Sequence, residues 1–185
     1  MVLPDVFNPK LLRSGALLVS VVARAGLVPP GSRVLDLGCG SGAAGLAAAR
    51  AGGRVTATDI NPAAVRCARA NALLNDLDVE VREGDLFAPL GDQRFDVVLF
   101  NPPYYRGVPR SALDRAWRSA DIIERFSEEL DEHLTPNGRA LVVLSSDGEP
   151  AAFLDALASR GFRHGVVAER DFVNEVMSVY LVTRC

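Results

Sequence analysis

Three aspartates and a glycine-rich turn are the groups in this sequence whose types and spacing could bind a charged small molecule. Asp36 precedes the turn Gly38-Cys39-Gly40-Ser41-Gly42-Ala43, which satisfies the pattern G-x-G-x-x-G/A. Asp59 comes 19 residues after Gly40, and Asp85 follows a third β-branched run. A glycine turn between a strand and a helix brings backbone N–H groups close to a ligand, and a neighbouring carboxylate favours cations. The pattern therefore predicts a nucleotide-like ligand that carries positive charge.

The position of Asp36 decides between two ligands that such a turn can bind. A dinucleotide places a pyrophosphate on the helix N-terminus, and a carboxylate at the tip of the preceding strand would repel it. S-adenosylmethionine has no phosphate, and its ammonium and sulfonium would be attracted instead. We therefore expect S-adenosylmethionine, with Asp59 accepting the ribose hydroxyls and Asp85 the adenine amino group, and with Leu86 or Phe87 against the ring. Each aspartate also has a purely structural alternative. Asp36 would make a strand-end or helix-turn hydrogen bond, Asp59 would be a charge at a helix N-terminus, and Asp85 would be an ordinary turn residue.

The segment Asn101-Pro102-Pro103-Tyr104 could hold a group that receives a methyl. Two prolines fix an extended backbone and remove two donors, so the Asn101 side-chain oxygen and the Pro102 carbonyl remain as acceptors. Two rigid acceptors can hold both hydrogens of a planar NH2 group while its nitrogen attacks, and the Tyr104 ring can stack on that plane. Such a transfer depends mainly on positioning and needs no separate base. The alternative is a simple turn, which Asn-Pro pairs often begin.

Short β-branched runs alternate with longer runs rich in Ala, Leu and Arg, and this alternation must position the groups above. It predicts βαβ units, with a mostly parallel sheet and helices on both of its faces. A short polar link between the last two strands favours an antiparallel closing pair. Ligands of open α/β sheets lie at the carboxyl ends of the strands, where the glycine turn and Asn101 both fall. The expected strands are 33–37, 54–58, 79–82, 95–100, 139–145, 164–168 and 175–183, and the expected helices are 14–25, 43–51, 63–73, 112–134 and 150–159, with Asn61 as an N-cap, Pro62 at the first helical position and a turn at 135–138.

Length, composition and charge limit the remaining function classes. The 185 residues suggest one domain, and 49% hydrophobic with 23% charged residues is typical of a globular chain. The net charge of −3 argues against a broad nucleic-acid footprint, although it allows a local basic patch. Three scattered cysteines and two histidines argue against a disulfide framework and against a zinc site. We find neither a secretory signal nor an apolar run long enough for a membrane span, so we expect a cytoplasmic protein.

The run Val34-Leu35-Asp36-Leu37-Gly38-Cys39-Gly40-Ser41-Gly42 resembles the first motif of the class I S-adenosylmethionine-dependent methyltransferases, and the resemblance extends from about Val6 to Val182. It implies the α/β, Rossmann-like fold of that class, with a mostly parallel seven-stranded sheet and an antiparallel closing strand. Asn-Pro-Pro-Tyr resembles the branch that methylates amino groups, which includes protein-glutamine N5-methyltransferases of the HemK/PrmC type, adenine-N6 methyltransferases and ribosomal-RNA guanine-N2 methyltransferases. This branch implies catalytic roles for Asn101, Pro102 and Tyr104. The implied cofactor-binding residues are Ser14, Asp36, Gly38, Gly40, Asp59, Ile60, Asp85, Leu86 and Asn101.

Residues 1–30 stand apart from the strand–helix alternation. We expect them to cap the cofactor site, with their helix lying across the ligand end of the sheet, ahead of a methyltransferase domain at 31–185. Ser14 would bind the carboxylate of the methionine moiety or would serve as a helix N-cap.

The acceptor stays open among several amino groups. The Asn that begins Asn-Pro-Pro-Tyr favours glutamine or RNA over DNA adenine, and the chain is close in size to the shorter HemK-like enzymes. We therefore expect a protein glutamine, such as that of a peptide-chain release factor, with an RNA base as the alternative and a non-catalytic S-adenosylmethionine-binding module as the third interpretation. Some short HemK-like enzymes need a small zinc-binding partner, so the resemblance also suggests an activator subunit. Arg106, Arg110, Arg115, Trp117 and Arg118 would line the acceptor pocket, or would instead lie on a solvated helix that packs its tryptophan inward.

Overall fold

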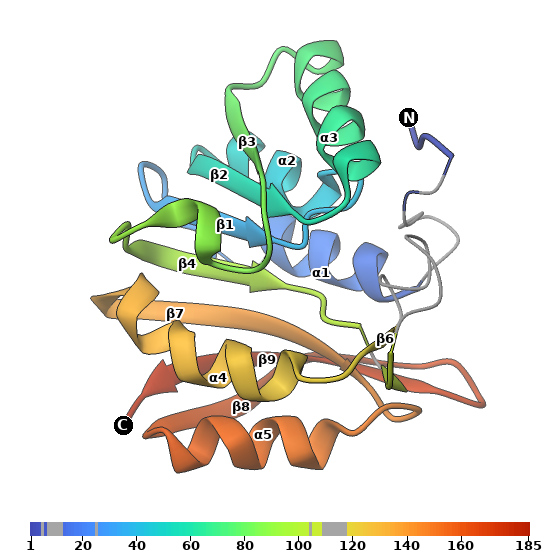
Figure 1. Cartoon of the computed structure of the whole chain (residues 1–185), viewed down its shortest axis with the longest axis vertical. Coiled ribbons are helices and arrows are strands. Elements are labelled where there is room, and N and C mark those ends of the chain that lie inside the picture. Colours follow the sequence, from blue (N-terminus) through green and yellow to red (C-terminus); the bar gives the residue numbers. More distant parts are fainter. Residues whose placement is uncertain (5, 7–12, 25, 104, 109–117) are drawn as a thin grey trace.

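A seven-stranded mixed sheet runs through the molecule, and helices cover both of its faces (Figure 1). The computed structural model describes residues 1–4, 6, 13–24, 26–103, 105–108 and 118–185. In chain order the elements are α1 (Arg13–Arg24), β1 (Arg33–Leu37), α2 (Ala43–Arg50), β2 (Arg54–Asp59), α3 (Pro62–Leu74), β3 (Val79–Glu83), the 3-10 turn η1 (Ala88–Leu90), β4 (Phe95–Phe100), β5 (Tyr105–Arg106), β6 (Arg118–Ser119), α4 (Ile122–His133), β7 (Leu134–Ser145), α5 (Pro150–Ser159), β8 (Phe162–Asp171) and β9 (Val176–Arg184).

The sheet has the strand order β3-β2-β1-β4-β7-β9-β8. Strands β3, β2, β1, β4 and β7 are parallel, whereas β9 pairs antiparallel with both β7 and β8. The predicted parallel sheet with an antiparallel closing pair is therefore confirmed. Strand order reverses between β1 and β4, and the carboxyl ends of these two strands are where an open α/β sheet binds its ligand.

Two apolar layers, one on each face of the sheet, hold the strands in place. On one face the buried rings of Phe100 and Phe126 stack with their centroids 4.5 Å apart, which joins β4 to α4. On the other face Leu18 and Val22 of α1 pack with Val34 of β1 and with neighbouring buried side chains of β4 and β7. The alternation of side chains along each strand explains why the two layers share the same strands. Removing any of these buried side chains should destabilise the scaffold by about 2–5 kcal/mol.

Helix α1 was expected across the ligand end of the sheet, but it packs along one face. Its buried residues Leu17, Leu18, Val21 and Val22 recur at helical spacing and belong to the second apolar layer. The sheet face buries this stripe, which explains why the helix lies along that face.

The predicted start of α3 is confirmed in atomic detail. The Asn61 side-chain oxygen accepts a hydrogen bond of 2.9 Å from the Ala63 backbone N–H, and Pro62 occupies the first turn. An N-cap of this kind is worth about 1 kcal/mol, and proline loses nothing there because its missing N–H would have no partner within the helix.

Two sequence predictions about the second half of the chain were wrong. The helix expected over 112–134 begins only at Ile122, and Arg118–Ser119 instead form β6, which pairs with β5 and is continued by a 3.0 Å bond from the Gly107 N–H to the Ser119 carbonyl. Residues 109–117 lie outside the described part.

The turn expected at 135–138 instead belongs to β7. These four residues lie opposite the single residue Asp96 of β4, in a bulge of the pairing between the two strands. The Thr135 hydroxyl donates to the Asp96 carboxylate over 2.9 Å, which explains how a turn-like sequence remains in the strand.

Candidate active site

The glycine turn joins β1 to α2 at the carboxyl end of the sheet. Gly38, Gly40 and Gly42 have φ values of 64°, 55° and 81°, in the left-handed region that favours glycine. At Gly42 the fit is also steric, because a Cβ there would lie 3.1 Å from the Cβ of Ala68 in α3. The turn is fastened to β2 by a 2.9 Å bond from the Cys39 N–H to the Thr58 carbonyl. These constraints fix the backbone where a ligand would approach it.

Asp59 at the end of β2 ties the turn to the start of α3. One carboxylate oxygen accepts the Gly40 N–H and the other accepts the Asn61 N–H, each over 2.8 Å. Burial raises the pKa of Asp59, and these two hydrogen bonds act in the opposite direction. Each oxygen still has a second lone pair, so the group can also accept from a ligand hydroxyl. The structural and the ligand-binding interpretations of this residue are therefore compatible.

Asp36 lies beneath the turn and is only 4% exposed. Its Oδ2 accepts the Gly45 N–H over 2.8 Å, so the helix-turn hydrogen bond considered as an alternative is present. Burial raises the pKa of Asp36 from 3.8 to about 7, the Gly45 hydrogen bond opposes this shift, and the charge of Asp59 adds to it. A carboxylate that is this costly to ionise would gain from a cation placed beside it.

Two adjoining cavities open at this end of the sheet. The larger has a volume of about 350 Å³ and the smaller about 80 Å³, and they share Gly38, Asp59, Asn61 and Asn101. The larger cavity is also lined by Ile60, Asp85, Leu86 and Pro103, and the smaller one by Asp36 and Gly40. Every predicted cofactor-binding residue except Ser14 therefore lines one cavity or the other.

Ser14 has a different environment from the one predicted. It is buried inside α1, so it is not the N-cap of that helix, and its neighbours Gly15 and Leu18 line the smaller cavity in its place.

The corner after β3 lines the larger cavity with Asp85 and Leu86. Asp85, expected to meet an adenine amino group, pairs through Oδ2 with the Arg125 guanidinium of α4 over 2.8 Å. Leu86 has a φ of 46°, which is rare for a non-glycine residue, and its carbonyl accepts the Thr58 hydroxyl over 3.3 Å. Sequence reasoning missed both Arg125 and Thr58. Strand alternation places Thr58 on the face of β2 opposite Ala57 and was a usable signal, whereas nothing local marks Arg125.

The Asn-Pro-Pro segment follows β4 at the junction of the cavities. Asn101 lines both, Pro103 lines the larger, and Pro102 is buried beside Leu144 and Ser145 at the end of β7. Tyr104 lies outside the described residues. Most of the predicted arginine-rich rim does so as well, and of Arg106 and Arg118 only the backbone is described.

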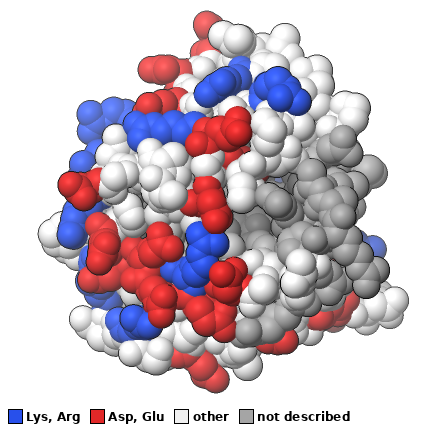
Figure 2. All heavy atoms as spheres, in the orientation of Figure 1, with Lys and Arg blue, Asp and Glu red and all other residues white. Residues whose placement is uncertain are grey.

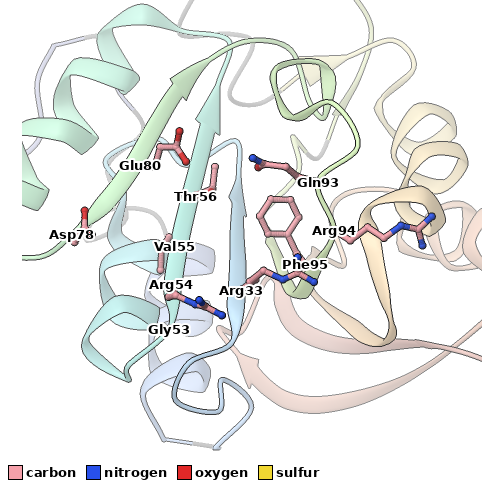
Figure 3. A pocket seen from close by; sticks show the side chains of 10 residues that line it. All are labelled: Arg33, Gly53, Arg54, Val55, Thr56, Asp78, Glu80, Gln93, Arg94 and Phe95. Atoms are coloured by element: carbon pink, nitrogen blue, oxygen red, sulfur yellow. The ribbon is translucent and has the colours of Figure 1, made fainter.

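A third cavity, of about 490 Å³, lies at the opposite end of the strands (Figure 3). Arg33, Arg54 and Phe95, which begin β1, β2 and β4, contribute to its walls together with Glu80 of β3. The connection between β3 and β4 contains only the short turn η1 and contributes no long helix beside this cavity. None of the predicted site residues lies there.

Other kinds of site find no support among the residues that the structure describes. No group of three or more His, Cys, Asp or Glu side chains in that part could hold a metal ion. No helix there has the length and apolarity needed to cross a membrane. Burial and the nearby charges of Asp36 and Asp59 raise the pKa of Cys39, which keeps its thiol protonated and unsuited to nucleophilic attack.

Comparison with known proteins agrees with this geometry. The methyltransferase small domain family matches residues 1–164. The release factor glutamine methyltransferase of Gloeobacter violaceus is 38% identical over 148 residues, which are 70% of this chain and 52% of that protein. The ribosomal RNA small subunit methyltransferase C of Alcanivorax borkumensis is 33% identical over 153 residues, which are 82% of this chain and 44% of that protein. The chain thus spans about half the length of these relatives.

A solved structure supports the fold over its full extent. The Mtq2 and Trm112 complex of E. cuniculi, described as responsible for methylation of the eRF1 translation termination factor, matches with a TM-score of 0.74 at 21% identity. The match covers 98% of this chain and 99% of that one. With the family match over residues 1–164, it follows that this chain is a member of the methyltransferase small domain family and has the class I methyltransferase fold.

Proposed function

We propose that the chain is an S-adenosylmethionine-dependent N-methyltransferase that methylates a protein glutamine side chain, such as that of a peptide-chain release factor. The observation that carries this proposal is the place of Asn101, which lines both cavities. An acceptor amide held there would be next to the methyl group of a cofactor that occupies the two cavities.

The described residues fit S-adenosylmethionine better than a phosphorylated nucleotide. Its adenosine would occupy the larger cavity between the apolar side chains of Ile60 and Leu86, with the ribose at Asp59. Its charged methionine end would occupy the smaller cavity, beside the glycine turn and Asp36. A cation bound there would compensate the charge of the buried carboxylate, whereas a pyrophosphate would add negative charge beside it. When bound, the cofactor supplies a methyl group on a positively charged sulfur.

The chain's own contribution is to hold the acceptor amide. The Asn101 side-chain oxygen and the Pro102 carbonyl would each accept one N–H of the glutamine side chain, which orients the nitrogen toward the methyl group. Accepting both hydrogens also favours the positive charge that develops on this nitrogen. One proton then passes to solvent after transfer, so no residue is needed as a general base. Tyr104 would stack on the amide plane in this scheme.

Glutamine is favoured over an RNA base by sequence relatives and by surface charge. Release factor glutamine methyltransferases of several bacteria match the chain at 33–40% identity. Figure 2 shows acidic side chains gathered over the region that α4 occupies in Figure 1. Helix α4 lines the larger cavity with Ile122 and Arg125, and it also carries Glu124, Glu128, Glu129, Asp131 and Glu132. A phosphate backbone would be repelled by this surface.

Methylation of an RNA base is the second candidate. It is favoured by the match to a ribosomal RNA methyltransferase, which extends over more of this chain than the matches to the glutamine enzymes. The same two acceptors would then hold the exocyclic amino group of a base.

Partners, setting and the N-terminal segment belong to the same proposal. We infer that the chain works in the cytoplasm, because its relatives are named for substrates of translation. We also propose that a small activator subunit assists it, and the likeness to the Mtq2 and Trm112 complex supports this proposal. We also propose that residues 1–30 cap the cofactor, with Gly15 and Leu18 of α1 as the wall of the smaller cavity.

Incubation with isotope-labelled S-adenosylmethionine tests this function. Purified release factor and ribosomal RNA are offered together, and both are analysed by mass spectrometry. We expect label on a glutamine of the release factor. Label on an RNA base with unlabelled protein would establish the second candidate instead, and a bound cofactor with neither acceptor labelled would favour a non-catalytic module.

A further inference from the structure

Arg125 places a positive charge beside the part of the cleft where the proposed cofactor is uncharged. Arg125 lines the larger cavity, its guanidinium lies 2.8 Å from Oδ2 of Asp85, and its side chain is 35% exposed. The charges of S-adenosylmethionine are on its methionine end, so a cation at the adenosine end does not serve to attract it. The group that Arg125 holds there is Asp85, through which it can act on the cofactor.

The backbone on which Asp85 stands is fixed without help from Arg125. Gly84 is packed so tightly that a Cβ there would lie 2.7 Å from Cγ of Pro89, and the Gly84 N–H donates to the Asp59 carbonyl over 3.0 Å. On the other side, the Leu86 carbonyl is held by the Thr58 hydroxyl. What this corner leaves undetermined is the orientation of the Asp85 side chain, which is 44% exposed and has several rotamers available to it.

We propose that Arg125 is a positioning residue that makes the site selective for a 6-aminopurine. By binding Oδ2 of Asp85, its guanidinium leaves the other carboxylate oxygen to accept a hydrogen bond from the purine amino group. An ionised carboxylate can only accept, so a 6-oxopurine, which has a carbonyl where adenine has its amino group, would bind less tightly. The inference rests on the proposed function, because it takes the adenosyl group to lie in the larger cavity.

The charges around Arg125 keep it in place for this role. The hydrogen bond to Asp85 raises the pKa of Arg125, partial burial acts against that shift, and the charges of Asp121 and Glu129 add to it. Asp121 directly precedes α4 and Glu129 lies on it, so Arg125 is held among three carboxylates that favour its charge. Loss of Arg125 would free the Asp85 side chain to take other rotamers.

Two ligands that differ only at the purine 6-position test the inference by calorimetry. S-adenosylhomocysteine should bind the wild-type protein at least about 10-fold more tightly than S-inosylhomocysteine, because an unpaired acceptor in the site opposes the oxo group. Arg125→Met should reduce this ratio to about 3-fold or less, mainly because the adenosyl ligand binds more weakly to the variant. Asp85→Asn should also reduce the ratio, because an amide can donate to the 6-oxo group. Adding Arg125→Met to Asp85→Asn should change the ratio no further.

Arg160→Met is the matched control. It removes an arginine, 50% exposed, from a 2.6 Å pair with Glu128 of α4, and neither residue of that pair lines the cavity. It should leave the ratio unchanged. An Arg125→Met variant with the same ratio as the wild type would overturn the inference, even if both ligands bound more weakly. The proposed function would stay intact, because the wild type still binds the adenosyl ligand. Binding of neither ligand to the wild type overturns both.

Discussion

Replacing Asp36 by Asn should stabilise the protein while weakening its hold on the cofactor. The side chain is 4% exposed and its pKa is raised from 3.8 to about 7, so ionising it in the folded state is costly. Three pKa units correspond to about 4 kcal/mol at a pH above 7. Because the buried amide has a desolvation cost of its own, we expect a gain of about 2–4 kcal/mol at pH 8, and each kcal/mol should raise Tm by about 2–4 °C in a domain of this size.

The expected gain in stability of the Asp36→Asn variant depends on pH. The folded-state pKa of Asp36 lies above the unfolded value, so its protonated form favours the folded state below about pH 4, and this contribution is lost as the pH rises to about 7. Asn does not titrate. The stability gap between variant and wild type should therefore be largest above pH 7 and fall to less than half by pH 5.

Thermal unfolding at pH 5 and pH 8, with calorimetry of S-adenosylhomocysteine at pH 8, measures both effects. We expect the variant to bind about 10- to 100-fold more weakly, the usual cost of losing an interaction with a charged group. The exposed Asp155 provides a control, since Asp155→Asn should change stability by less than about 0.5 kcal/mol at either pH. A variant that is less stable than wild type at pH 8, or a gap that does not depend on pH, would refute the reasoning about burial.

Three further predictions concern the same cleft. Asn101→Ala should abolish methyl transfer but leave the cofactor Kd within a few-fold, and unchanged transfer would remove the Asn-Pro-Pro segment from the mechanism. Asp59→Ala should weaken cofactor binding by about 1.5–3 kcal/mol in calorimetry, because the ribose hydroxyls lose a charged acceptor, and an unaltered Kd would contradict that role. Gly45→Ala should destabilise the fold by about 1–3 kcal/mol in denaturant unfolding, because its Cβ would lie 2.8 Å from Oδ2 of Asp36. Gly165→Ala, where a Cβ meets nothing within 4 Å, is its control, and equal stability of the two variants would argue against the clash.

The part of the fold that could be predicted from the sequence is the part in which local signals and long-range packing agree. The bounds of β1 and β4 were predicted without error, because each is an apolar run closed by a glycine or by Asn-Pro. The start of α4 was wrong because the residues before Ile122 have helical composition. Backbone pairing of β6 with β5 decides the conformation of Arg118–Ser119 instead. Composition alone carries no information about such a pairing.

The candidate site shows the same division. Gly38, Asp59 and Asn101 were identifiable because each follows a predicted strand, and a parallel sheet brings such positions to one edge. The partner of Asp85 could not be found in this way. Arg125 reaches the cavity only because α4 packs back against the sheet, so its role depends on the tertiary arrangement and leaves no local trace.

A single competition titration tests the central claim, that the carboxylates beside the glycine turn admit a cationic methyl donor and exclude a pyrophosphate. S-adenosylmethionine and NAD⁺ are titrated separately and together into the wild-type protein at pH 8. We expect saturable binding of S-adenosylmethionine, with the same Kd whether or not NAD⁺ is present in excess. Tight binding of NAD⁺ that S-adenosylmethionine cannot displace would contradict it.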